Sequence, residues 1–84
     1  MNAVNWTRKA AKQLFKLQPQ HQQQVRDAVG GLRRMPDCQN VKALHSHQFG
    51  YRLRVGNYRV LFDWDGEIKV VAVQEVKKRD ERTY

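Results

Sequence analysis

The chain has 84 residues, 40% of them hydrophobic, which is enough for one small domain spanning residues 1–84 with a modest core. Sixteen lysines and arginines against eight acidic residues give a net charge of +8, which favours a polyanionic partner such as nucleic acid or an acidic protein. The one cysteine, Cys38, excludes an intramolecular disulfide and suits a reducing cytoplasm, and no apolar run is long enough for a secretory or membrane segment.

The first half of the chain predicts a short strand followed by two helices. Residues 3–6 fit the strand, and Thr7 is a candidate N-cap for a helix that begins at Arg8. Pro19 suits the first turn of a second helix, which we expect to run to about Arg34. Apolar residues at i, i+3, i+4 and i+7 mark the buried face of the second helix. They are Val25, Ala28, Val29 and Leu32.

Residues 51–62 are the most informative segment and predict a tight β-hairpin. Two alternating runs flank Gly56-Asn57, a two-residue loop of the primed-turn kind, which sets Arg54 opposite Arg59. Side chains alternate between the two faces of a strand, so the hairpin has two unlike faces. One face carries Tyr51, Leu53, Val55, Tyr58, Val60 and Phe62, and the other carries Arg52, Arg54 and Arg59.

The arginine pairing in this hairpin is not explained by stability. Like charges directly opposite each other destabilise a sheet, so the pairing of Arg54 with Arg59 is expected to lower the stability of the hairpin. A solvated polar face is the simplest interpretation for one or two arginines. Three on one face favour a polyanion site, because the guanidinium fork matches phosphate oxygens.

The rest of the chain completes an α+β fold. Residues 41–44 lead towards the sheet, and Asp65-Gly66 predicts a second hairpin turn into an apolar strand over residues 68–73. Residues 76–84 form a basic tail. We therefore expect a helical hairpin packed on a small antiparallel sheet of three strands, or four with the N-terminal one, in the order β-α-α-β-β-β.

The tail adds a second basic group. If it folds back along the sheet, Lys78, Arg79 and Arg82 join the arginines of the hairpin. Several guanidinium groups could then stabilise the charge that develops on one phosphate. The terminal Tyr84 could stack on a nucleotide base, or it could be a frayed end.

His45 and His47 form the other candidate cluster. They could supply a general base, or they could bind a metal ion together with Cys38, although the sequence shows no fourth ligand at suitable spacing. Exposed loop histidines are the simplest interpretation. We therefore expect no metal site.

Familiar cofactor motifs are absent from the sequence. There is no glycine-rich phosphate loop, no dinucleotide fingerprint and no clear acidic pair for a metal ion. A two-metal nuclease is thus not expected, and no cofactor is predicted. Phosphodiester cleavage without metal points to RNA, whose 2′-hydroxyl can act as the internal nucleophile.

These residues resemble the RelE/ParE toxin superfamily over nearly the whole chain. The resemblance is carried by Leu44, by the hairpin within residues 50–62 and by the basic tail that ends in Tyr84. It implies the toxin of a type II toxin-antitoxin pair. RelE-type members enter the ribosomal A site and cut mRNA by 2′-hydroxyl attack, leaving a cyclic phosphate and a 5′-hydroxyl. ParE-type members poison DNA gyrase.

The resemblance also implies partners. Toxins of both kinds are neutralised by a small, acidic, partly disordered antitoxin that wraps the toxin. The complex commonly represses its own operon, so operator DNA would be bound only through the complex. The ribosome and mRNA would be the targets of a RelE-type member, and no membrane partner is implied.

By position, the resemblance implies roles for several residues. Arg52 and Arg54 take the places where RelE has lysines, one of which is thought to act as general base. Arg59 matches the arginine that stabilises the phosphate, and Arg79 matches the proposed general acid, with Arg82 as the alternative. Tyr84 matches the tyrosine that stacks on the base. Lys78, Arg82 and His47 are the predicted substrate-binding residues.

The change from lysine to arginine leaves three alternatives open. Arginine is effectively always protonated and is a poor general base. Cleavage could rely on electrostatics and positioning, or His45 or His47 could supply the base. Alternatively, the protein is a gyrase inhibitor or a nucleic-acid or ribosome-binding module without catalysis.

Overall fold

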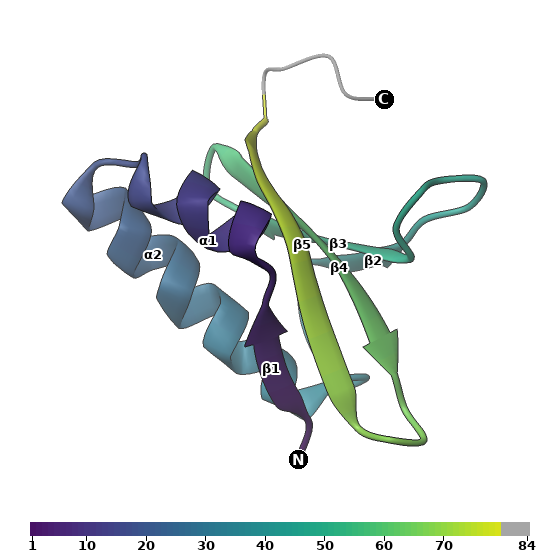
Figure 1. Ribbon diagram of the computed structural model, residues 1–84. Coiled ribbons are helices and arrows are strands. Elements are labelled where there is room, and N and C mark those ends of the chain that lie inside the picture. Colours follow the sequence, from purple (N-terminus) through teal and green to yellow (C-terminus); the bar gives the residue numbers. More distant parts are fainter. Residues whose placement is uncertain (80–84) are drawn as a thin grey trace.

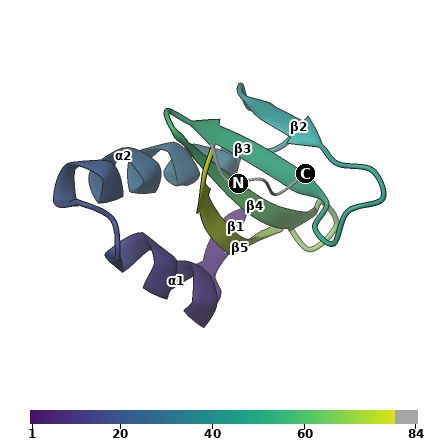
Figure 2. The same cartoon turned by 90° about the horizontal axis from the view of Figure 1, so that it is seen from above.

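Within residues 1–79, two helices pack on one face of a five-stranded sheet, and the opposite face carries no helix (Figures 1 and 2). This computed structural model describes residues 1–79. The elements in chain order are β1 (Ala3–Trp6), α1 (Arg8–Phe15), α2 (Pro19–Gly30), the 3₁₀ turn η1 (Gly31–Arg34), β2 (Val41–Ala43), β3 (Tyr51–Val55), β4 (Tyr58–Asp65) and β5 (Val70–Lys78).

The α+β class and the helical hairpin are confirmed, but the sheet is larger than predicted and is mixed. Its strand order is β1-β5-β4-β3-β2. The segment Val41–Ala43 is a strand that pairs antiparallel with β3, which adds a fifth strand at one edge. At the other edge β1 pairs parallel with β5, because the helical hairpin carries the chain across the sheet between them.

The two helices begin where the sequence predicts. The Thr7 hydroxyl accepts a hydrogen bond from the backbone N–H of Ala10 at 3.1 Å, and proline opens α2. The second helix ends earlier than expected, because its last turn from Gly31 onwards tightens into the 3₁₀ form. A Cβ atom on either Gly30 or Gly31 would meet nothing within 4 Å, so these glycines weaken the helix rather than allow close packing.

The predicted register of the β3–β4 hairpin is confirmed. Arg54 lies opposite Arg59 and Val55 lies opposite Tyr58. Gly56 has a φ of +52°, the positive value that a primed turn requires at its first loop position.

The turn between β4 and β5 is longer than the two residues predicted. It spans residues 66–69, and β5 begins at Val70. The carboxylate of Asp65 accepts hydrogen bonds from the backbone N–H groups of Glu67 at 2.9 Å and Ile68 at 3.2 Å, which stabilises a wider turn. Lys69 closes this turn with a positive φ of 56°.

A β-bulge at Gln74 changes which side chains of β5 face the helices. Leu61 pairs with Glu75, whereas the next residue of β4 pairs with Val73, so Gln74 is the extra residue. Beyond the bulge, Val76 enters the core. Glu75 and Lys77 therefore lie on the helix-free face.

The core lies between the helices and the sheet. The largest fully buried side chains there come from α2, η1, β4 and β5, and Tyr51 stacks on Phe62 at 5.4 Å between ring centroids. No helix within residues 1–79 is long and apolar enough to cross a membrane. The helix-facing core residues of the sheet are Leu53, Val55, Tyr58, Val60, Phe62, Val71, Val73 and Val76.

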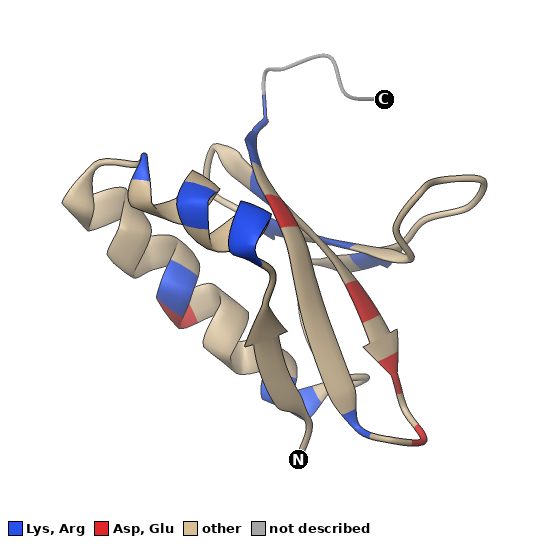
Figure 3. Cartoon of the chain, viewed as in Figure 1, with Lys and Arg blue, Asp and Glu red and all other residues tan. Residues whose placement is uncertain are grey.

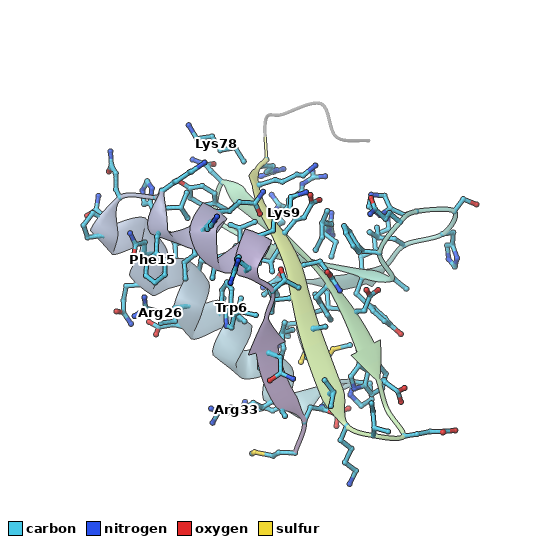
Figure 4. All side chains as sticks on the ribbon, viewed as in Figure 1. Trp6, Lys9, Phe15, Arg26, Arg33 and Lys78 are labelled. Carbon is cyan, nitrogen blue, oxygen red and sulfur yellow. The ribbon has the colours of Figure 1, made fainter. Side chains whose placement is uncertain are left out.

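We expect Phe62→Ala to lower the free energy of unfolding by about 3–5 kcal/mol, because it leaves a cavity at a position that is 0% exposed. The matched control is Phe15→Ala, since Phe15 is 66% exposed on α1 (Figure 4) and its loss should change stability by less than about 0.5 kcal/mol. Urea unfolding followed by circular dichroism measures both. Equal losses in the two variants would contradict this assignment of the core.

Candidate functional site

The helix-free face of the sheet carries a basic surface, which we name the arginine face. Its members are Arg52, Arg54, Arg59 and Lys77, and lysine and arginine positions are also seen on α1 (Figure 3). One cross-strand row runs Arg54, Arg59, Lys77 over β3, β4 and β5. The three predicted hairpin arginines therefore do lie together.

The arginine face lowers the stability of the sheet locally. The row from Arg54 to Lys77 places three cations side by side, and cross-strand pairs of like charge are destabilising. The Nε atom of Arg52 is buried and finds no hydrogen-bond partner within residues 1–79. A buried donor without a partner costs about 1–3 kcal/mol. Local costs of this kind are expected at functional or strained sites.

A buried carboxylate lies beside the arginine face, on the same side of the sheet. Glu75 is 7% exposed, and its two oxygens contact the ammonium groups of Lys9, from α1, and Lys77, the latter at 3.5 Å. Figure 4 shows Lys9 on α1 beside β5. Burial would raise the pKa of Glu75, but the hydrogen bond from Lys9 and the charge of Lys77 outweigh it, so this pKa lies below its usual value.

Sequence reasoning missed both Glu75 and Lys77. Simple alternation from Val71 and Val73 along β5 would place Lys78, not Lys77, on the arginine face. The available signal was the next buried valine, Val76, which comes three positions after Val73 instead of two. That irregular spacing indicates one extra residue in the strand.

The predicted tail residues Lys78 and Arg79 lie around the end of the hairpin. Lys78 pairs with Tyr58, whose side chain faces the helices. A cavity of about 470 Å³ is lined here by both tail residues with His21, Asn57 and Tyr58. His21 Nδ1 is hydrogen-bonded to the Tyr58 hydroxyl at 2.8 Å, a pair that sequence reasoning did not anticipate. Arg82 and Tyr84 lie outside the described residues.

The two candidate histidines, His45 and His47, lie in the loop between β2 and β3, residues 44–50. His47 Nδ1 accepts a hydrogen bond from the backbone N–H of Phe49 at 3.1 Å. The base of the loop is held at the helix-free face, where Asp63 accepts hydrogen bonds from the Gly50 backbone N–H at 2.8 Å and from Gln74 at 3.2 Å. The bulge and the loop are therefore joined by one carboxylate.

Cys38 belongs to a different neighbourhood. Its thiol donates to the carbonyl oxygen of Gly31 at 3.3 Å, next to η1. Burial and the negative charge of Asp37 raise the pKa of this thiol, which makes the thiolate form that metals prefer less available. Within residues 1–79, no group of three or more His, Cys, Asp or Glu side chains is placed to hold a metal ion.

Comparison with known proteins identifies the family. The model of a family described as the ParE toxin of type II toxin-antitoxin systems matches residues 4–83. The chain belongs to the RelE/ParE toxin family. The resemblance drawn from the hairpin and the tail is thus confirmed. A search of the curated proteins finds no significant match to the toxin.

Solved structures share the fold of the toxin. A chain of the toxin-antitoxin complex RelBE2 from Mycobacterium tuberculosis is 30% identical, with a TM-score of 0.79 over 93% of this chain and 98% of that one. A chain of the archaeal RelE-RelB complex from Pyrococcus horikoshii is 24% identical, with a TM-score of 0.81 over 95% of this chain and 97% of that one. A chain of the chromosomal ParDE system from P. aeruginosa is 18% identical, with a TM-score of 0.70 over 93% of this chain and 96% of that one. Both branches therefore have this fold.

We expect Glu75→Gln to destabilise the toxin by about 1–3 kcal/mol at neutral pH, because it removes the charge that Lys9 and Lys77 contact. Since folding lowers the pKa of Glu75, its contribution is complete above the unfolded value of about 4.3 and is lost as pH falls through the folded value. Urea unfolding from pH 7 to pH 3 should show the difference between the two proteins shrink progressively as the pH falls below the unfolded value of about 4.3. A constant difference across that range would contradict this role.

Proposed function

We propose that the toxin is a metal-independent endoribonuclease that cuts mRNA on the ribosome and so inhibits translation. The observation that carries the proposal is the arginine face, where a row of cations occupies the exposed side of the sheet. A surface of this kind suits the phosphodiester backbone of single-stranded RNA. The need for an anion also accounts for its cost to stability.

The arginine face offers the groups that phosphate recognition needs. Guanidinium groups from neighbouring strands can bind non-bridging phosphate oxygens and stabilise the charge that develops there during in-line attack. The buried Nε–H of Arg52 is a donor that a phosphate oxygen would satisfy. Arg59 lies between Arg54 and Lys77 in the row and is thus the natural centre of the site.

In this proposal the RNA supplies its own nucleophile. The 2′-oxygen attacks the adjacent phosphorus, giving a 2′,3′-cyclic phosphate and a 5′-hydroxyl. Arg52 and Arg54 position the phosphate, and Arg59 stabilises the transition state. From the tail, Arg79 acts as the general acid for the leaving 5′-oxygen, and Tyr84 stacks on a base. Lys78, Arg82 and His47 extend the contact with the RNA on either side.

We also propose that a small acidic antitoxin is the regulatory partner. Two of the similar solved structures are toxin-antitoxin complexes, RelBE2 and RelE-RelB. The net charge of +8 favours an acidic partner that covers the arginine face and so competes with RNA. Operator DNA would be bound through that complex.

A second candidate function is inhibition of DNA gyrase. It is favoured by one observation, the match of residues 4–83 to a family named for the ParE toxin. The arginine face suits DNA phosphates as well as RNA phosphates, because phosphate contacts carry no sequence or sugar information by themselves. A direct comparison of the two activities is therefore needed.

We expect Arg59→Ala to lower mRNA cleavage by about 10²–10³-fold, the typical cost of losing one donor to a developing oxyanion. Its free energy of unfolding should stay within about 1 kcal/mol of the parent, because the substitution also removes repulsion with Arg54. Primer extension on ribosome-bound mRNA measures the cleavage. Arg8→Ala, on the exposed surface of α1, is the control that should cut normally. Full activity in Arg59→Ala would contradict this site.

The ribosome and gyrase can be separated with one preparation of toxin. We expect addition of the toxin to a coupled translation reaction to stop protein synthesis and to leave mRNA fragments with cyclic phosphate ends. Supercoiling by purified gyrase should proceed normally at the same toxin concentration. Inhibition of supercoiling while translation continues would assign the toxin to the second function instead.

A further inference from the structure

The cavity at the end of the β3–β4 hairpin, which we name the hairpin-end cavity, lies outside the arginine face. It has a volume of about 470 Å³, and polar side chains line it, namely His21, Asn57, Tyr58, Lys78 and Arg79. Tyr58 faces the helices, whereas the arginine pair next to the turn, Arg54 and Arg59, lies on the opposite face. The arginine face and the cavity therefore meet at the hairpin end from opposite sides of the sheet.

The hairpin-end cavity is positively charged. Lys78 is exposed at the end of β5 on the helix side, and Arg79 follows it. Within residues 1–79, no carboxylate lines the cavity, and neither of these two cations forms an ion pair. An ammonium and a guanidinium group at one cavity, without a neutralising partner among the described residues, suit an anion such as a phosphate.

His21 and Tyr58 add a hydrogen-bond donor to this cavity. One hydrogen bond joins His21 Nδ1 to the Tyr58 hydroxyl at 2.8 Å. If the hydroxyl donates to Nδ1, the neutral imidazole carries its own proton on Nε2. If Nδ1 donates instead, the hydroxyl proton is left for another acceptor. In either arrangement the pair keeps one donor for a ligand, and Tyr58 positions His21 through this bond.

Arg79 connects the cavity with the proposed cleavage. Its backbone N–H donates a hydrogen bond to the carbonyl oxygen of Asn57, which holds the start of the tail against the hairpin turn. In the proposed function Arg79 acts on the leaving 5′-oxygen. The RNA fragment that carries this oxygen therefore begins at Arg79, and its next phosphate follows one nucleotide further along the chain. The hairpin-end cavity is the cationic site at that place.

We propose that the hairpin-end cavity binds the first phosphate on the 3′ side of the cleaved bond, an inference that rests on the proposed function. Lys78 contacts this phosphate through its charge, and the His21–Tyr58 pair donates a hydrogen bond to it. RNA is favoured over an acidic protein segment, because the cavity starts beside the group that acts on the leaving oxygen. Binding a phosphate on each side of the leaving nucleoside holds that nucleoside in line for attack.

The test uses the full chain, ribosomes and three synthetic mRNAs with a 5′ label. The first has phosphates throughout. The second carries a neutral methylphosphonate in place of the first phosphate 3′ of the mapped cleavage position. The third carries it far outside the ribosomal A site. The 2′-hydroxyls next to these two positions are absent from all three mRNAs, so that the methylphosphonate is stable.

The variants remove one proposed contact each. Lys78→Met removes the charge and keeps much of the stem, and His21→Phe keeps a ring without its nitrogens. Lys12→Met, on the exposed side of α1, is the matched control for the loss of a lysine. For each protein, the cleavage rate on the second mRNA is divided by the rate on the first. This ratio does not depend on the folded fraction of a variant.

We expect the nearby methylphosphonate to slow the wild type and Lys12→Met about 10-fold or more, because a charge-assisted contact is lost. The distant one should have no effect. Lys78→Met should cut the all-phosphate mRNA about 10-fold more slowly than the wild type, and His21→Phe a few-fold more slowly. In both, the nearby methylphosphonate should cost less than about 3-fold further, because the contact that it removes is already lost.

The outcomes separate this inference from the proposed function. If the wild type cuts the all-phosphate mRNA but the nearby methylphosphonate has no effect, the inference is wrong and the proposed function stands. An equal effect in all four proteins would assign the phosphate to the ribosome and leave the cavity to another partner, which also overturns the inference. If the wild type cuts none of the mRNAs on the ribosome, the proposed function fails and this inference fails with it.

Discussion

The pairing of β4 with both of its neighbours is the constraint on which the core and the candidate site depend. Along this one strand, Val60 and Phe62 enter the core while Arg59 and Leu61 lie on the opposite face. Because side chains alternate, a slip of one residue in the register would exchange the two faces. The arginine face is therefore as well fixed as the hydrophobic core, although little within the face itself favours its formation.

The arginine face costs stability, and the rest of the domain offsets that cost. The row from Arg54 to Lys77 is repulsive, and the buried Nε of Arg52 lacks a partner within residues 1–79. Against this, Glu75 supplies one buried negative charge, and α1 contributes Lys9 to hold it. The carboxylate relieves part of the repulsion at Lys77 without occupying the exposed side of the arginines.

Local signals made much of the fold predictable. The loop Gly56-Asn57 determined the hairpin register, and Thr7 marked the start of α1, because turns and caps depend on neighbouring residues only. The parallel pairing of β1 with β5 joins residues about 67 positions apart, and no local pattern reports it. The bulge at Gln74 is intermediate between a local and a long-range feature. It forms in the pairing of β5 with β4, but the three-residue spacing between the buried Val73 and Val76 indicates it in the sequence.

The bulge also decides which side chains of β5 join the arginine face. Along β3 alone, this face presents arginines at positions 52 and 54. Across the sheet, Lys77 joins the same face from β5, opposite Arg59. The chemistry of such a site depends on which side chains share a face, because a phosphate contacts the surface and not one strand. Matching motifs position by position along one strand can therefore miss a side chain that a neighbouring strand supplies to the same face.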